Sequence, residues 1–131
     1  MTKKAILLVD DESNVLLTLR MVFENEGFVV TTADSCAEAL KILQDNRHFD
    51  AVVTDLNMES ENIGLEVAHA AVAKKPKPAV VISTGFATVS NSKEALNMGV
   101  DYMAHKPVEL DSLIFILNQL TSARDQKKWI F

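Results

Sequence analysis

Five short apolar runs, each followed by a stretch with helical spacing, constrain this chain more than any other feature. The runs cover residues 4–9, 28–32, 51–54, 79–83 and about 101–105. They are rich in Ile, Leu, Val and Ala, as expected of strands that are buried on both faces. Strands that alternate with helices predict a parallel sheet covered by helices on both sides.

The helices between these runs are marked by apolar periodicity and by signals at their ends. The spacing over residues 15–23 predicts a helix, and Gly27 follows where a left-handed end is favoured. Ser35 and Glu38 match the two positions of a capping box, which predicts the start of the next helix. Further helices are expected over residues 64–73, 88–98 and from about 110 onwards.

Right-handed crossovers leave few topologies for five such units, and strand order 2-1-3-4-5 is the common one. We therefore expect an α/β, doubly wound, flavodoxin-like sheet flanked by five helices. The chain is expected to form one domain, with a core over about residues 4–124 and a tail or helix extension over residues 125–131. In such sheets, ligands bind beyond the carboxyl ends of the strands, here between the first and third strands.

Composition excludes several classes of protein. The 131 residues are 48% hydrophobic and 24% charged, which is typical of a globular domain. A net charge of −5 with scattered basic residues argues against direct binding of nucleic acid. Cys36 is the only cysteine, so a disulfide within the chain and a cysteine metal cluster are excluded. No apolar run approaches the roughly 18 residues of a membrane span, and we expect a cytoplasmic protein.

Polar side chains stand where the predicted strands end. Asp10 and Asp11 follow the first strand, Asp55 the third, Thr84 the fourth and Lys106 the fifth. Each one alone has an ordinary explanation as a cap, a turn residue or a solvated charge. Together they place three carboxylates at one crevice, an arrangement that repels itself unless a cation enters. A divalent ion and the lysine would balance the charge, and oxygen ligands suit Mg²⁺.

This set of groups suits phosphoryl transfer. A carboxylate beside Mg²⁺ can act as a nucleophile toward phosphorus and form an acyl phosphate. Lys106 would offset charge on the phosphoryl oxygens, and Thr84 would donate a hydrogen bond to one of them. Positioning and electrostatics supply most of such catalysis, so no separate base is needed.

Four motifs together closely resemble the response-regulator receiver family of two-component signal transduction. The resemblance covers about residues 4–124, and its motifs are Leu7-Leu8-Val9-Asp10-Asp11-Glu12, Thr54-Asp55-Leu56-Asn57-Met58, Ser83-Thr84-Gly85 and Lys106-Pro107.

The resemblance implies a role for each polar residue of the motifs. It makes Asp55 the phosphoacceptor, Asp11 a direct Mg²⁺ ligand, and Asp10 a ligand acting mainly through water. It also implies a metal contact from the backbone carbonyl of Asn57. Thr84 becomes the switch hydroxyl, and Lys106 pairs with the phosphoryl group after a cis bond to Pro107.

By the same resemblance, the chain is a bacterial-type phosphoprotein and signalling module, not an enzyme in the ordinary sense. Its donor is a histidine kinase or phosphotransfer protein. Its output is a downstream protein or an output domain, reached through the face of the fourth helix, fifth strand and fifth helix; homodimerisation through that face is possible. A pseudo-receiver that signals by binding alone is the alternative, which the intact set of acids, hydroxyl and lysine disfavours. An aspartyl-phosphate phosphatase of the haloacid-dehalogenase type needs a second Asp where Asn57 stands.

Three positions depart from the family pattern. The loop over residues 59–63 is acidic and longer, so that Gly64 falls one residue late, and we expect the loop to be more mobile. Met103 occupies the usual aromatic position, while Tyr102 falls one step earlier on the strand. Either Met103 replaces the aromatic rotor and Tyr102 lies at the surface, or a bulge restores the aromatic.

Three other features leave alternatives open. Phe86 either overhangs the pocket and shields the acyl phosphate, or contacts a partner. His105 is expected at the surface or pocket rim. The apolar residues 129–131 extend the last helix and pack on the body, lead into a linker, or form a self-association patch.

Overall fold

The computed structural model describes the backbone of residues 3–130 and the side chains of residues 3–122. Its five strands form one parallel sheet in the order β2-β1-β3-β4-β5, which confirms the expected topology. The elements are β1 (Ala5–Val9), α1 (Ser13–Asn25), β2 (Val29–Ala33), α2 (Cys36–Gln44), β3 (Ala51–Asp55), α3 (Gly64–Val72), β4 (Ala79–Thr84), α4 (Val89–Met98), β5 (Tyr102–His105) and α5 (Leu110–Ile130).

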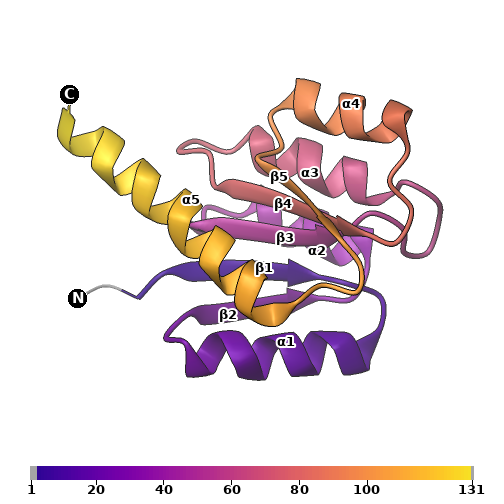
Figure 1. Ribbon diagram of the computed structural model, residues 1–131, viewed down its shortest axis with the longest axis horizontal. Helices are drawn as coiled ribbons and strands as arrows, with labels where there is room; N and C mark the ends of the chain where they lie inside the picture. Colours follow the sequence, from indigo (N-terminus) through magenta and orange to yellow (C-terminus); the bar gives the residue numbers. More distant parts are fainter. Residues whose placement is uncertain (1–2, 131) are drawn as a thin grey trace.

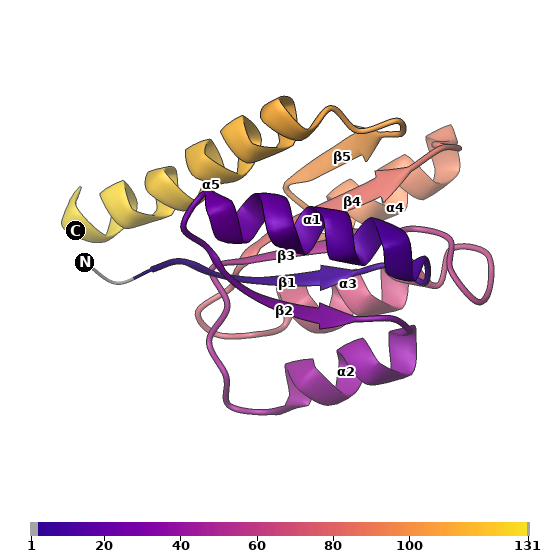
Figure 2. The same ribbon diagram turned by 90° about the horizontal axis from the view of Figure 1, so that it is seen from below.

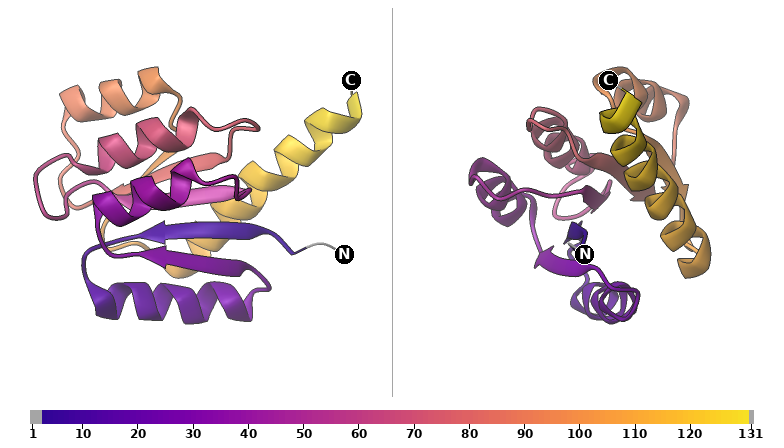
Figure 3. Two further views of the ribbon diagram at one scale, coloured as in Figure 1. Left: turned by 180° about the vertical axis from the view of Figure 1, so that it is seen from behind. Right: turned by 90° about the vertical axis from the view of Figure 1, so that its left-hand side faces the viewer.

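Helices cover both faces of the sheet, so the molecule has three layers. Figures 2 and 3 show α1 and α5 on one side and α2 and α3 on the other. One buried cluster joins the sheet to α2, α3 and α4, and a second joins it to α1 and α5. Ile6 and Leu7, neighbours on β1, belong to opposite clusters and are both 0% exposed. This two-sided burial explains why the strands read as continuous apolar runs.

Several element boundaries differ from the sequence prediction by one residue. β2 begins at Val29 because Phe28 packs edge-on against Phe23 in the α1/α5 cluster. The backbone N–H of Phe28 donates to the carbonyl of Phe23, and this hydrogen bond closes the end of α1. Gly27 has a φ of 96°, so the predicted left-handed helix end is confirmed. α3 ends at Val72, one residue before the expected end.

The helix caps confirm the predicted cap at Ser35 but place the complete capping box in another helix. Ser35 accepts a hydrogen bond from the backbone N–H of Glu38, as predicted. The reciprocal bond from Glu38 does not occur among the described residues, so the capping box predicted there is only half formed. A complete capping box occurs instead in α4, where the side chains of Thr88 and Asn91 each accept from the backbone of the other.

α5 continues to Ile130, so the alternative in which the tail extends the last helix is confirmed for the backbone. Figure 1 shows its carboxyl-terminal half running past the strands, toward the side from which β1 enters. Whether the apolar side chains there pack on the body stays a prediction, and Phe131 lies outside the described residues. Within the described part of the chain, no helix is both long and apolar enough to cross a membrane.

Candidate functional site

The strand register brings the predicted site residues to one edge of the sheet. Asp55 is the last residue of β3 and pairs with Ser83 of β4, directly before Thr84. Thr84 in turn pairs with His105, so that Lys106 leaves β5 beside it. In Figure 1 this edge lies on the right, where the arrows of the strands end. The site is therefore assembled by backbone pairing of consecutive parallel strands.

Three carboxylates meet at this edge. One oxygen from each of Asp10, Asp11 and Asp55 lies within 4.8 Å of the other two. Asp10 and Asp55 are 4% and 6% exposed, whereas Asp11 is exposed. The backbone N–H of Glu12 donates to Asp10 Oδ1 at 2.9 Å, which fixes one of the carboxyl groups. Closely spaced carboxylate oxygens that remain open on one side match the donors that Mg²⁺ prefers, so the residues fit this ion.

Lys106 joins the carboxylates from the opposite side. Its Nζ lies 3.1 Å from Asp55 Oδ2 and 3.7 Å from Asp10 Oδ2. The Lys106–Pro107 bond is cis, as predicted. The backbone N–H of Lys106 donates to the carbonyl of Thr84 at 2.8 Å, which ties the start of this turn to β4. The expected convergence of acids and ammonium is thus present.

Burial and pairing shift the pKa values of both Asp55 and Lys106. Desolvation raises the pKa of Asp55, the hydrogen bond and charge of Lys106 oppose the rise, and the charges of Asp10 and Asp11 add to it. Desolvation acts to lower the pKa of Lys106, but the hydrogen bond and charge of Asp55, with Asp10 and Glu12, outweigh it and raise that pKa. The lysine therefore stays charged, and the carboxylate cluster favours further positive charge.

Thr84 lies at the same edge, but within the described part of the chain its side chain makes no hydrogen bond to the carboxylates. Its side chain is 1% exposed, and Oγ1 accepts a hydrogen bond from the N–H of Phe86 at 3.0 Å. A hydroxyl has one donor besides its acceptor sites, so its O–H is still able to donate. Phe86 is 83% exposed, and whether it shields the acyl phosphate stays a prediction. The partner-contact alternative for Phe86 stays a prediction.

The loop between β3 and α3 has defined anchors. Asn57 Oδ1 accepts from the N–H of Asn62 at 2.7 Å, and Asn62 adopts a left-handed φ of 61°. Glu59 Oε1 accepts from the N–H of Cys36 at 2.9 Å, which joins the loop to the amino end of α2. These hydrogen bonds oppose free motion of the loop. Its greater length and mobility relative to the family pattern stay predictions. The backbone carbonyl of Asn57 accepts no hydrogen bond within the described part of the chain.

Gly64 lies against the end of β3, although the loop before it is predicted to be one residue longer than the family pattern. Its N–H donates to the carbonyl of Leu56 at 2.8 Å. A Cβ at this position would collide with the carbonyl oxygen of Asp55 and lie 2.7 Å from the Cα of Leu56. The loop therefore absorbs its extra residue before Gly64, and the helix keeps its contact with the acceptor strand.

The register of β5 decides between the two alternatives for Tyr102 and Met103. Tyr102 to His105 pair one to one with Val81 to Thr84, so the alternative with a bulge is wrong. Met103 is half-buried and packs on the cluster that includes Ala95 of α4. Tyr102 points to the other face and is 40% exposed. His105 is exposed at the end of β5, as expected.

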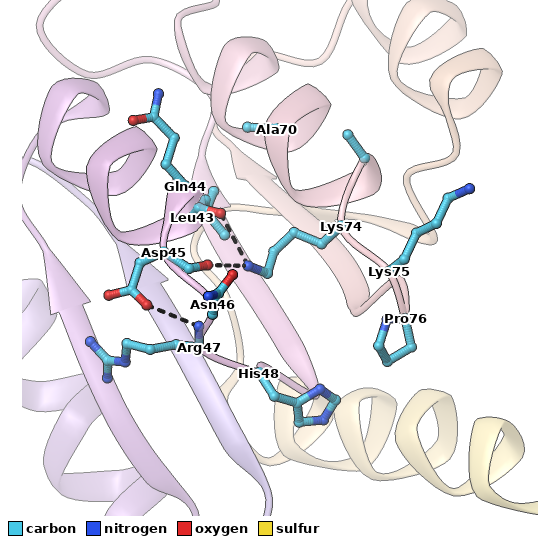
Figure 4. A pocket seen from close by; sticks show the side chains of 11 residues that line it. Leu43, Gln44, Asp45, Asn46, Arg47, His48, Ala70, Lys74, Lys75 and Pro76 are labelled. Carbon is cyan, nitrogen blue, oxygen red and sulfur yellow. Dashed lines mark hydrogen bonds between the residues drawn. The ribbon is translucent and has the colours of Figure 1, made fainter.

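Two surface hollows differ in their relation to the site. A groove of about 750 Å³ adjoins it, between α1 and the start of α5, and Asp10, Lys106 and Pro107 are among its lining residues. A second hollow of about 440 Å³ lies at the opposite end of the sheet, lined by residues 43–48, residue 70 and residues 73–76 (Figure 4). There Lys74 Nζ donates to the carbonyls of Leu43 and Asp45 at the end of α2. This lysine is a structural clamp between α2 and the end of α3.

Sequence reasoning missed two features of these surroundings. The Lys75–Pro76 bond is cis, and nothing in the sequence distinguishes it from a trans bond. The left-handed Asn62 was not predicted either, although asparagine is the residue type, after glycine, that tolerates this conformation best. Asn62 lies inside the lengthened loop, which was the available signal.

Comparison with known proteins identifies the family. Residues 6–118 match the family described as the response regulator receiver domain, and the chain belongs to this family. It is 40% identical over 109 residues to the alginate biosynthesis transcriptional regulatory protein AlgB of Pseudomonas aeruginosa, covering 82% of this chain and 24% of that protein. It is 32% identical over 114 residues to the photosynthetic apparatus regulatory protein RegA of Cereibacter sphaeroides, covering 87% of this chain and 61% of that protein. The chain thus spans about a quarter of the first relative and about three fifths of the second.

Solved structures agree with this assignment. A CheY-like receiver domain protein from Methanospirillum hungatei has a TM-score of 0.89 at 27% identity, covering 96% of this chain and 99% of that one. A receiver domain protein from Clostridium thermocellum has a TM-score of 0.83 at 30% identity, covering 98% and 99%. Receiver domains are signalling modules of two-component systems that bind Mg²⁺ at an acidic pocket and are not classical enzymes.

Proposed function

We propose that Asp55 accepts a phosphoryl group from a phosphohistidine, carried by a sensor histidine kinase or a phosphotransfer protein, in a Mg²⁺-dependent reaction. The observation that carries this proposal is the contact of Lys106 Nζ with Asp55 at 3.1 Å, next to Asp10 and Asp11. This arrangement provides a nucleophile and places positive charge beside it.

The metal-binding residues in this proposal are Asp10, Asp11, Asp55 and the backbone carbonyl of Asn57. The close approach of the three carboxylates within 4.8 Å supports the first three. The location of Asn57 two residues after Asp55, in the loop beside the acids, supports the fourth. When bound, Mg²⁺ would neutralise charge on the acids and on the phosphoryl oxygens.

The chain's own residues perform the rest of the reaction. A carboxylate oxygen of Asp55 forms a bond to phosphorus, and the phosphorus–nitrogen bond of the phosphohistidine breaks. The electron pair of that bond stays on the ring nitrogen, and the imidazole, which carries a proton on its other nitrogen, leaves as a neutral ring. Lys106 moves its hydrogen bond from the carboxylate to a phosphoryl oxygen, and the Thr84 hydroxyl donates to another. Hydrolysis of the acyl phosphate later returns inorganic phosphate and the free carboxylate.

The consequence of phosphorylation is a population shift in the face formed by α4, β5 and α5. This face carries several exposed apolar side chains, which supports binding to a downstream protein or an output domain: Val89, Leu96 and Phe115 are 81%, 57% and 64% exposed. A homodimer through the same face is the alternative assembly. We place the protein in the cytoplasm and treat residues 1–131 as one receiver domain.

The experiment that tests the proposal is phosphorylation by acetyl phosphate, with and without Mg²⁺, followed by intact mass measurement. Wild type should gain one phosphoryl group only with Mg²⁺, and Asp55→Asn should gain none. Asp111→Asn, at an exposed aspartate of α5, is the matched control and should behave as wild type. Phosphorylation of Asp55→Asn to the wild-type extent, or none in wild type with Mg²⁺ and donor, contradicts the proposal.

A further inference from the structure

We propose that Asn62 and Asn91 are positioning residues that transmit occupancy of the metal site to the amino end of α4. The inference rests on the proposed function, because it takes the carbonyl of Asn57 as a metal ligand. It concerns a chain of hydrogen bonds that runs from Asn57 through Asn62 and Asn91 to Thr88, the residue that caps α4.

The first link joins the metal loop to a constrained residue. The side chain of Asn57 holds the N–H of Asn62 at 2.7 Å, so the position of one residue fixes the other. Among described residues other than glycine, Asn62 is the one with a positive φ, at 61°. An unusual backbone conformation persists when its surroundings determine it, and such residues concentrate at switch segments.

The second link crosses from the loop to α4. Asn91 Nδ2 donates to Asn62 Oδ1 at 3.4 Å, and the side chain of Asn91 is buried, with 6% of the residue exposed. The same amide also belongs to the capping box: Asn91 Oδ1 accepts from the N–H of Thr88 at 2.8 Å. One planar amide thus contacts the loop with its nitrogen and the helix cap with its oxygen. A movement of Asn62 therefore changes the position of the Asn91 amide, which is part of the α4 capping box.

The weak apolar anchoring of α4 makes this polar contact important. Of the helix residues Val89–Met98, all described, Asn91 and Ala95 are buried, and Met98 is partly buried against the core. Val89 and Leu96, which would strengthen a core contact, are 81% and 57% exposed. A helix with so little buried apolar surface has a low free energy of local displacement, so one hydrogen bond changes its position or order measurably.

Met103 of the neighbouring strand β5 provides no strong polar link to α4. Met103, which packs on the cluster containing Ala95, has only a thioether, which is a weak acceptor and no donor. Figure 1 shows α3 and α4 side by side, both beginning near the edge where the strands end. The hydrogen bond between Asn91 and Asn62 therefore links the loop directly to α4.

Two substitutions break the link from opposite sides and leave its surroundings intact. Asn91→Asp keeps the oxygen that accepts from Thr88 and removes the donor toward Asn62. Asn62→Gly removes the acceptor and retains a residue that adopts positive φ freely. Asn97→Asp makes the same chemical change at an exposed position of α4 and is the matched control.

The readout is amide hydrogen exchange at Asn91 and Ser92, whose N–H groups donate to the side chain and the carbonyl of Thr88. The Glu38 amide, capped by Ser35, is the internal reference. In wild type and Asn97→Asp, Mg²⁺ with beryllofluoride should slow exchange at Asn91 and Ser92. In Asn91→Asp and Asn62→Gly this ion-induced slowing should fall by about fivefold, the scale of one neutral hydrogen bond.

A double-mutant cycle in ion-free protein tests the contact itself. Asn62→Gly should speed exchange at residue 91 and Ser92 in the wild-type background, and should have no further effect in the Asn91→Asp background. An equal effect in both backgrounds overturns the link, as does a wild-type ion response in either single variant. Loss of Mg²⁺ binding in Asn62→Gly, measured by calorimetry, also overturns it, because Asn62 would then only hold the metal loop.

The same samples separate this inference from the proposed function. Wild type that binds Mg²⁺ and accepts phosphate on Asp55, with an unchanged ion response in the variants, refutes the link alone. Wild type that neither binds Mg²⁺ nor accepts phosphate refutes the proposed function, and with it the transmission from the metal site.

Discussion

Gly64, the first residue of α3, lies so close to Asp55 that a single methyl group on it would overlap the carbonyl oxygen of that aspartate. The contact places the start of a helix directly on the backbone of the proposed phosphoacceptor. The backbone atoms of Asp55 and Leu56 leave no room for a side chain where this helix begins.

Replacement of Gly64 by alanine should therefore lower the free energy of unfolding by about 3 kcal/mol, the upper end for an overpacked site, because the obstructing atoms are backbone. Urea unfolding followed by circular dichroism measures this loss. Gly85→Ala is the control: nothing lies within 4 Å of its Cβ position, and we expect a change below about 0.5 kcal/mol. Equal stability of both variants would show that α3 relaxes freely.

Removal of the Lys106 ammonium should strengthen Mg²⁺ binding and weaken phosphorylation. Lys106→Met takes a positive charge from beside Asp55 and Asp10, so Mg²⁺ affinity should rise about tenfold, while the rate with acetyl phosphate falls. Calorimetry and intact mass measure the two effects. Lys106→Arg retains the charge and should leave Mg²⁺ affinity near the wild-type value; equal affinities in both variants would contradict the electrostatic account.

Cys36 should make the protein less stable in alkaline solution. Burial, followed by the charge and hydrogen bond of Glu66 and the charge of Glu59, raises the pKa of this thiol above its ordinary value of 9.0. As pH rises past that value, the unfolded thiol loses its proton while the folded thiol keeps it. The unfolded state then binds fewer protons, so the free energy of unfolding falls as pH rises.

The measurement for Cys36 is the urea midpoint at about pH 8 and about pH 10, values on either side of the ordinary thiol pKa. Wild type should lose more stability across this interval than Cys36→Ala, and the difference between the two proteins isolates the thiol from other groups. Parallel pH profiles would show that the thiol titrates normally in the folded protein.

Tyr102→Phe should leave the response to beryllofluoride unchanged. The phenol ring lies on the face opposite Met103 and is 40% exposed, so its hydroxyl has no part in the contacts of α4. Chemical shifts of α4 and β5 amides, recorded with and without Mg²⁺ and beryllofluoride, test this. A lost or reduced response in Tyr102→Phe would show that the aromatic ring of this chain takes part in switching after all.

The sequence was sufficient to predict the sheet and most of the site because both follow from local patterns. Apolar runs gave the strands, parallel topology placed their carboxyl ends together, and Asp55 and Lys106 then had to be neighbours. The helix boundaries were less certain. Thr88 was expected inside α4 but caps it, because the capping partner is Asn91, and not the Glu or Gln of the usual motif.

Features that depend on tertiary contacts could not be predicted. The left-handed Asn62, the anchoring of Glu59 on α2 and the collision that excludes a side chain at position 64 all depend on contacts between residues that are not neighbours in the sequence. Loop length indicated that the region would differ, but hydrogen bonds to α2 and α4 decide how it differs. The exposed orientation of Phe86 is likewise a property of the folded loop.

The assembly of the site by strand pairing has a consequence for divergence within the family. Backbone ladders place the reactive groups, so apolar side chains beneath them can be exchanged over evolutionary time without moving the chemistry, provided their volume is kept. This accounts for a structure from Methanospirillum hungatei that superposes with a TM-score of 0.89 while sharing 27% of its residues. The interior of such a scaffold can therefore vary in sequence within a fixed volume while its polar edge stays in place.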